Sequence, residues 1–151
     1  MREILFRAKA INRDPDREYR TDYKNGDWVY GLVSKLYDED FYEEFPHIPA
    51  EMTNKDGVSG IDIDYKTIGQ YTGLTDKNGN KIFEGDILKI GIEEDDYVLC
   101  EVYEYRGVMC VDYETPDWDF NALAFLDDDN VFIFEIIGNI HDNPELTGGK
   151  E

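Results

Sequence analysis

Hydrophobic and polar residues alternate with a period of two along much of the chain, which is typical of half-buried β-strands. Within residues 28–37, for example, Trp28, Tyr30 and Leu32 fall on one side of an extended backbone. Aromatic residues, which favour pleated surfaces, make up 14% of the chain and strengthen this interpretation. The pattern predicts strands over residues 4–11, 28–37, 61–74, 81–92, 97–114 and 131–146.

Two dipeptides predict tight turns between these strands. Asn78-Gly79 is typical of a two-residue hairpin turn in which both residues take positive φ, and Asp76 would then form an exposed pair with Lys81. Arg106-Gly107 predicts a second hairpin inside residues 97–114. The register of this second hairpin would place Tyr105 opposite Val108, Tyr103 opposite Cys110 and Cys100 opposite Tyr113.

That register also bears on the two cysteines of the chain, Cys100 and Cys110. Side chains alternate between the faces of a β-ribbon, so the two thiols would lie on opposite faces, too far apart to form a disulfide. We therefore expect two buried and free thiols.

The remaining segments are less regular. Residues 38–60 form a long irregular connection that could contain a short strand around Phe41 to Phe45. Apolar residues spaced three and four apart predict one short helix near residues 118–126. The segment 131–146 is largely apolar, and we expect a central strand that is buried on both faces.

These elements predict a mainly β protein of antiparallel strands, built as a small barrel or sandwich. We expect an N-terminal β part over residues 1–60, a C-terminal barrel-like part over residues 61–146 and a tail over residues 147–151, or one compact domain that contains all of them. Gly85 would introduce a bulge or bend into its strand. No apolar run reaches membrane-spanning length, so a cytoplasmic location is the default expectation.

Acidic residues change the picture of possible partners. The formal net charge is −20, and residues 91–135 contain 14 acidic residues against the single cation Arg106. Such a chain repels nucleic-acid phosphates and anionic membranes, so direct binding to either is not expected. The remaining partner classes are cations, basic proteins and apolar surfaces.

The stretch 76–88, DKNGNKIFEGDIL, resembles a calcium-binding loop at first sight. In such a loop, position 6 is glycine and position 12 is glutamate. Here Lys81 and Ile87 occupy those two positions, so the stretch is interpreted as a hairpin turn.

Other candidate chemistry is sparse. The acidic runs 38–40, 93–96 and 127–129 lack the mixed ligand pattern of a tight metal site, and His47 and His141 have no metal-binding companions at suitable spacing. The sequence contains no nucleophile, phosphate-loop or dinucleotide motif. We therefore expect no catalytic residue, cofactor or metal.

Three segments resemble a known family. TIGQYTGLTDKNGNKIFEGDILKI (67–90), EIIGNIHDNPEL (135–146) and the opening strands are similar to the YopX-like proteins, small proteins of phages and prophages of Gram-positive bacteria. The resemblance implies a mainly β fold, a bacterial cytoplasm as the setting and no established activity. It marks a folding signature rather than an active site, and the signature residues are Gly69, Gly73, Asn78, Gly79, Gly85 and Gly138.

Three functions follow as hypotheses. The first is a non-enzymatic module that binds an unknown host or phage protein through residues 38–60 and 91–130, the segments outside the family resemblance. The second is an acidic mimic of nucleic acid that targets basic DNA-binding proteins, and the third is a metal-dependent enzyme that uses clustered carboxylates. An exposed strand edge would also allow self-association. The expected partner surface comprises Phe41, Tyr42, Phe45, Asp127, Asp128 and Asp129.

Overall fold

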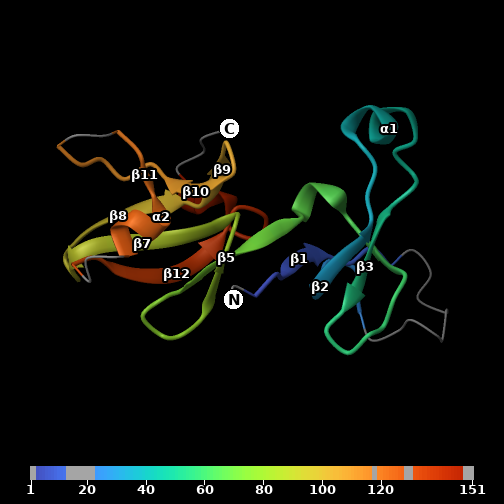
Figure 1. The fold of residues 1–151 in the computed structure, drawn as a ribbon, viewed down its shortest axis with the longest axis horizontal. Coiled ribbons are helices and arrows are strands. Elements are labelled where there is room, and N and C mark those ends of the chain that lie inside the picture. The colour runs from blue at the N-terminus through green and yellow to red at the C-terminus, as the bar shows by residue number, and fades with distance from the viewer. Residues whose placement is uncertain (1–2, 13–22, 117–118, 128–130, 148–151) are drawn as a thin grey trace. The chain divides into compact units, whose positions relative to one another are not determined.

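A computed structural model describes residues 3–12, 23–116, 119–127 and 131–147 of the 151-residue chain (Figure 1). Its helical elements are α1 (Glu39–Glu44), η2 (Tyr65–Thr67), α2 (Leu123–Asp127) and η3 (Pro144–Thr147). Its strands are β1 (Phe6–Lys9), β2 (Trp28–Lys35), β3 (Ala50–Asn54), β4 (Ile61–Ile63), β5 (Gly69–Thr75), β6 (Lys81–Phe83), β7 (Asp86–Glu93), β8 (Asp96–Glu101), β9 (Tyr103–Tyr105), β10 (Val108–Val111), β11 (Asn121–Ala122) and β12 (Ile133–Asn139).

Strands predominate among the described elements and every described strand pair is antiparallel, which confirms the predicted mainly β, antiparallel class. The described strands do not close into a barrel, so a sandwich-like description fits better. The chain divides into two compact units, residues 1–70 and residues 71–151. The division falls within β5, whose first two residues pair with β1 and whose later residues pair with β6.

The first unit is built on the strand order β4-β3-β2-β1. The alternation along β2 buries Val29 and exposes Tyr30 and Leu32. Tyr30 and Leu32 therefore lie on the solvent face of β2. The guanidinium of Arg7, which is buried, lies 4.6 Å from the ring centre of Trp28. The core of this unit contains Ala8, Ala10, Val29, Tyr42, Ala50, Met52, Ile61 and Ile63.

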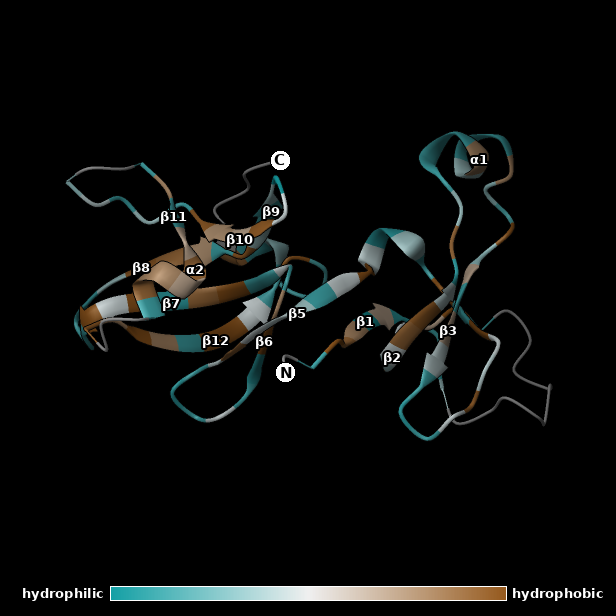
Figure 2. Cartoon of the chain, in the orientation of Figure 1, coloured by the Kyte–Doolittle hydropathy of each residue, from teal (hydrophilic) through white to brown (hydrophobic). Residues whose placement is uncertain are grey.

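The second unit contains two three-stranded sheets, β12-β7-β8 and β11-β10-β9. Alternation along the central strand β7 places Leu88 and Ile90 in the core, and Figure 2 shows the resulting hydrophobic bands. The core residues of this unit are Ile82, Leu88, Ile90, Cys100, Val102, Val111, Leu123, Leu126 and Phe134.

The loop between β5 and β6 is organised by Asp76, which is buried. Its Oδ1 accepts hydrogen bonds from the backbone N–H groups of Asn78 and Asn80, both at 2.9 Å. Its Oδ2 accepts from the N–H of Ile136, 60 residues away, at 3.1 Å. The predicted exposed pair with Lys81 is wrong, because the carboxylate is used to join the loop to β12.

The register of this hairpin also differs from the prediction. Lys81 pairs with Thr75, and the turn has the hydrogen bond from the Gly79 N–H to the Asp76 carbonyl at 3.0 Å. Gly79 has the expected positive φ, at +81°. Among the non-glycine residues of the described ranges, however, only Arg106 has a positive φ. Asn78 therefore keeps a negative φ, and the loop is longer than a two-residue turn.

The predicted register of the hairpin at Arg106-Gly107 is confirmed close to the turn and is wrong further away from it. Tyr105 pairs with Val108 and Tyr103 pairs with Cys110, as predicted. The chain then bends at Val102, whose N–H donates to the Asp86 carbonyl at 2.9 Å. Because of this bend β8 pairs with β7, so that Cys100 lies opposite Leu88 and not opposite Tyr113. Both cysteines are buried and neither forms a disulfide, as predicted.

Three other expectations are corrected by the structure. Residues 39–44 form helix α1 and not a short strand. The predicted helix near 118–126 is shorter and begins at Leu123, directly after β11. β12 pairs with β7 alone among the described strands, so it is an edge strand with an exposed face and not a central one.

The glycines of the family signature occupy different environments. Gly73 and Gly85 have φ of +88° and +90°, a conformation that favours glycine, and Gly85 lies in the turn between β6 and β7, where a bend was predicted. Gly138 instead has a close neighbour, because an added Cβ would lie 2.5 Å from the Asn143 Oδ1. Gly69 begins β5, where it pairs with Arg7.

Candidate functional site

The candidate site lies in the first unit and is built around the short helix α1. Asp38 precedes the helix as its N-cap, and its Oδ1 accepts a hydrogen bond from the Phe41 N–H at 2.9 Å. Glu39 and Asp40 follow in the first turn, where acidic side chains interact favourably with the helix dipole. The acidic run 38–40 therefore starts a helix.

Helix α1 carries an aromatic cluster. The Phe41 ring stacks on Tyr37 at a centroid distance of 3.9 Å and lies 5.1 Å from Phe45, one helical turn further along. Tyr42 stacks on Tyr65 of η2, at 4.0 Å and an interplanar angle of 7°. These contacts attach the helix to the sheet, because Tyr65 follows directly after β4 and Asp64.

The expected exposure of the three aromatic site residues is only partly found. Phe45 is 37% exposed and Phe41 is half-buried. Tyr42 is only 2% exposed, and its hydroxyl accepts a hydrogen bond from the Tyr37 N–H at 3.2 Å. The prediction that Tyr42 is an exposed contact residue is wrong, because it is a core residue that fixes α1.

Beside this cluster the first unit has a groove of about 420 Å³, which we call the α1 groove. Residues from α1, from the segment before β3, and from β4 and η2 meet here. The walls are mainly aromatic rings, proline rings and isoleucine side chains. The lining residues are Ile11, Tyr42, Glu43, Pro46, Ile48, Pro49, Ile63, Asp64, Tyr65 and Lys66.

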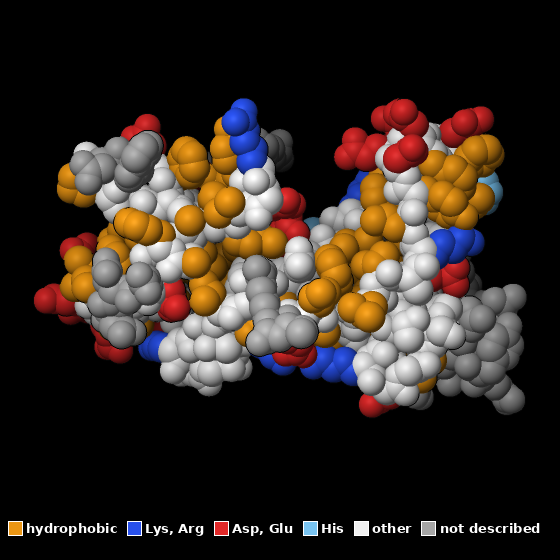
Figure 3. All heavy atoms as spheres, viewed as in Figure 1, with side chains coloured by type: hydrophobic (Ala, Val, Ile, Leu, Met, Phe, Trp, Pro, Cys, Tyr) orange, Lys and Arg blue, Asp and Glu red, His pale blue; other side chains and the backbone are white. Residues whose placement is uncertain are grey.

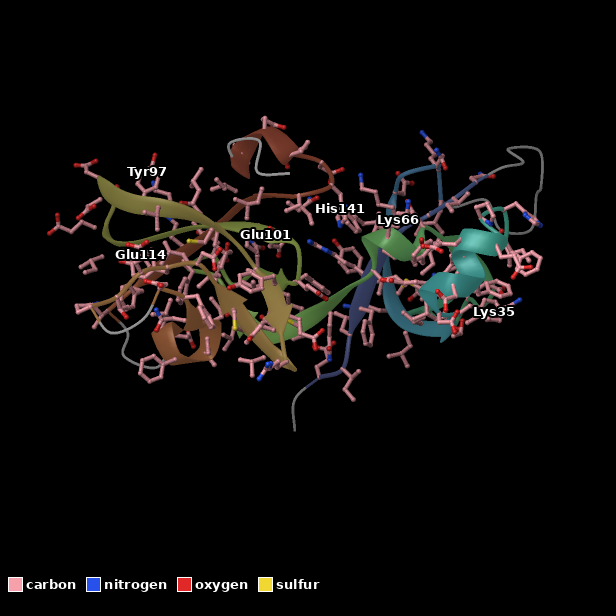
Figure 4. All side chains as sticks on the ribbon, turned by 90° about the horizontal axis from the view of Figure 1, so that it is seen from above. Lys35, Lys66, Tyr97, Glu101, Glu114 and His141 are labelled. Carbon is pink, nitrogen blue, oxygen red and sulfur yellow. The ribbon has the colours of Figure 1, made fainter. Side chains whose placement is uncertain are left out.

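Charges around the α1 groove are mainly negative. Glu43 and Asp64 line it together with one cation, Lys66, which Figure 4 shows on η2. Figure 3 shows acidic side chains gathered over α1 next to hydrophobic ones. Five of the seven residues from Asp38 to Glu44 are acidic. The groove therefore combines apolar walls with an acidic rim.

A second cation, Lys35, lies at the end of β2 and is held by its neighbours. Its Nζ is 3.6 Å from a Glu51 carboxylate oxygen and 5.6 Å from the ring centre of Tyr37. A hydrogen bond with Tyr37 raises the pKa of Lys35, and the charge of Glu51 adds to this effect. Lys35 is therefore engaged by these groups and does not line the α1 groove.

The other half of the expected partner surface belongs to the second unit. Asp127 is half-buried and ends α2. Asp128 and Asp129 lie outside the described residues. These three positions are therefore in a different unit from Phe41, Tyr42 and Phe45.

The second unit also contains a small group of interacting titratable side chains. The Tyr103 hydroxyl donates a hydrogen bond to the Asp112 carboxylate at 2.6 Å, and burial together with this bond raises the pKa of Tyr103. Burial, and secondarily the charge of Asp112, raises the pKa of Glu101. Burial and then Asp112 raise the pKa of Cys110 in the same way. The group can hold a proton on Glu101 at higher pH than an ordinary carboxyl.

Within the residue ranges that the structure describes, no group of three or more His, Cys, Asp or Glu side chains is placed to hold a metal ion. Within the same ranges, no helix is long and apolar enough to cross a membrane.

Sequence reasoning missed the α1 groove because its walls come from distant segments. Tyr42 and Tyr65 are 23 positions apart, and only the fold brings their rings together. Tyr42 and Tyr65 themselves were a visible signal, since aromatic residues are enriched at protein–protein interfaces.

Comparison with known proteins agrees with the resemblance of the three sequence segments to YopX-like proteins. The family described as YopX protein matches residues 18–147. A search of curated proteins found no match. Among solved structures, the fold is similar to the crystal structure of protein yopX from Bacillus subtilis, with a TM-score of 0.54, 17% identity, and coverage of 97% of this chain and 98% of that one.

A second solved structure shows the same relationship. Protein EF1440 from Enterococcus faecalis is similar with a TM-score of 0.51 and 25% identity, and the alignment covers 97% of this chain and 99% of that one. Both relatives match along nearly their whole lengths, and the family match covers most of this chain. The chain therefore belongs to the YopX family.

Proposed function

We propose that this protein is a non-enzymatic protein-binding module of phage or prophage origin, which acts in the cytoplasm of a bacterial host through the α1 groove. The observation that supports this proposal is the combination of apolar walls and an acidic rim in one groove of about 420 Å³. Pockets that hold small ligands are typically about 300–1,000 Å³, so a groove of this size has room for a side chain of a bound segment.

The walls of the groove suit binding because they are already ordered. Tyr42 is fixed by its stacking on Tyr65 and by its hydrogen bond with the Tyr37 N–H. Proline side chains, at Pro46 and Pro49, have almost no rotamer freedom to lose. A partner that covers such walls buries apolar area without the cost of ordering flexible side chains on this protein.

The rim selects the kind of partner. Glu43 and Asp64 carry negative charge into the groove, and the neighbouring acids of α1 increase it. Opposite charges accelerate association and disfavour acidic competitors. The expected partner is therefore a protein segment that combines apolar residues with at least one lysine or arginine.

The test is quantitative affinity capture from bacterial cells with the tagged full-length protein. Glu43→Lys reverses a charge on the rim of the groove, whereas Glu44→Lys makes the same change at the next exposed position, which does not line it. We expect a stoichiometric partner that the Glu44→Lys variant retains and the Glu43→Lys variant loses. Mass spectrometry of the eluate identifies the partner.

The same experiment separates the alternatives. Equal capture by both variants, or no stoichiometric partner, would contradict the proposal. Partners that are basic DNA-binding proteins and that DNA displaces would instead support the mimicry of nucleic acid. The metal-dependent enzyme needs a separate activity assay, in which turnover of a substrate that requires a divalent cation would support it.

A further inference from the structure

The second unit exposes an unusually apolar strand at the end of a sheet. β8 ends the order β12-β7-β8, and its residues Tyr97, Val98 and Leu99 are 48%, 47% and 41% exposed. β7 is its only paired strand among those described, and η3 packs against it without pairing. A strand edge of this kind presents backbone N–H and C=O groups that can pair with an added strand.

Both faces of β8 contribute apolar contacts for such a strand. Leu99 pairs with Lys89 and Tyr97 pairs with Gly91, so Leu99 and Tyr97 share one face, while Val98 is on the other. The Lys89 Nζ lies 4.2 Å from the ring centre of Tyr97, a residue of β8 that Figure 4 labels. An added strand would therefore gain cross-strand contacts on both sides of the sheet.

The charges at both ends of β8 decide which strand fits. Residues 93–96 are all acidic, and Glu101 and Glu104 follow the apolar residues, with no lysine or arginine anywhere in 93–104. Antiparallel pairing of β8 with a second copy, centred on Val98 and Leu99, would place Asp96 opposite Glu101. Like charges that face each other are destabilising, so a second copy is disfavoured.

We propose that β8 binds a β-strand of a partner protein, with apolar or β-branched residues in its middle and lysine or arginine at its ends. This mode of recognition combines main-chain hydrogen bonds with side-chain selection at alternate positions. It uses the second unit and does not depend on the α1 groove, so either site can be tested without the other.

The test uses the ¹⁵N-labelled full-length protein and synthetic peptides of about ten residues, a length that matches a typical strand. The first peptide alternates valine and threonine and has two lysines at each end. The second replaces all lysines with glutamate. We expect the first peptide to shift the amide resonances of Tyr97 to Glu101 in a saturable manner, and the second to bind at least roughly tenfold more weakly.

Two further arms test the pairing itself. Leu99→Lys should weaken binding of the lysine-ended peptide by roughly tenfold, because edge lysines oppose strand addition, especially of a basic strand. Phe125→Lys changes another exposed residue of the same unit and should have no effect. A peptide with N-methylated backbone amides on its pairing edge should not bind the unaltered protein, and this arm holds even if Leu99→Lys fails to fold.

Several results would overturn the proposal. These are equal binding of both peptides, undiminished binding of the N-methylated peptide, or shifts that leave Tyr97 to Glu101 unaffected. Concentration-dependent shifts of the same residues without peptide would show that a second copy occupies the edge, which also contradicts it.

Discussion

Replacement of Asp76 should destabilise the second unit far more than a substitution in a loop normally does. Asp76 is 6% exposed, and its carboxylate accepts three backbone hydrogen bonds at 2.9, 2.9 and 3.1 Å. Two donors are in its own loop, at Asn78 and Asn80, and the third is the Ile136 amide of β12. The side chain therefore closes the loop and attaches it to an edge strand at the same time.

The magnitude follows from these contacts. Hydrogen bonds to a charged group contribute about 1.5–3 kcal/mol each, but the loop donors can bind water once the carboxylate is removed. We therefore expect Asp76→Ala to lower the free energy of unfolding by about 2–4 kcal/mol. Asp76→Asn should cost about 2 kcal/mol, because the amide has only one acceptor oxygen for donors that now approach from two sides.

The assay is urea denaturation followed by circular dichroism, together with hydrogen exchange of the Ile136 amide. Glu104→Ala is the control, because it also removes one negative charge from the second unit but at an exposed position, and should change stability by less than about 0.5 kcal/mol. A loss in Asp76→Ala no larger than in this control, or unchanged protection of the Ile136 amide, would refute the reasoning.

Three further predictions concern other parts of the fold. Gly31→Ala should destabilise the first unit by about 3 kcal/mol in a denaturant titration, because the added Cβ would overlap the Thr53 carbonyl of β3; an unchanged midpoint would exclude this overlap. Glu101→Gln should stabilise the protein at neutral pH, where burial and a neighbouring carboxylate penalise the ionised form. This gain should shrink as the pH falls through the raised folded-state pKa of Glu101, since the wild-type side chain then becomes neutral, and a constant gain in thermal melts across pH would contradict it. Cys100 and Cys110 should react with a thiol reagent only after unfolding, because both are buried, and rapid labelling of the native protein would show otherwise.

Local chemistry was sufficient to predict some parts of this fold. The Arg106-Gly107 turn was predicted with the correct register near its tip, because the turn needs positive φ at both positions, here +51° and +83°. The period-two pattern was sufficient to predict the mainly β class, because the alternation of side chains is a local property of a strand.

Other parts depend on residues that are distant in sequence. The role of Asp76 depends on the backbone amide of Ile136, 60 residues away, and the sequence around Asp76 does not indicate that partner. The edge position of β12 was missed because an apolar strand can have one edge covered by a loop in place of a second strand. Here the loop between β5 and β6 takes that place, and the backbone N–H of Lys77 donates a hydrogen bond to the Phe134 carbonyl at 2.9 Å.

The candidate site was the least predictable part. The sequence pointed to Phe41, Tyr42 and Phe45 as exposed aromatic residues, but helix formation after Asp38 turns Tyr42 inwards onto Tyr65. An interpretation as a strand or loop cannot anticipate this, because in a helix neighbouring residues point in different directions around the axis. The groove exists only after this helix has packed against η2.

The most direct test of the binding function is site-specific photo-crosslinking in bacterial cells. A photo-reactive phenylalanine derivative replaces Glu43 in the α1 groove or, as a control, Glu104 on β9 of the second unit. We predict a single protein adduct of defined mass from position 43 and none of that mass from position 104. No adduct from position 43, or the same adducts from both positions, would contradict a protein-binding role for the groove.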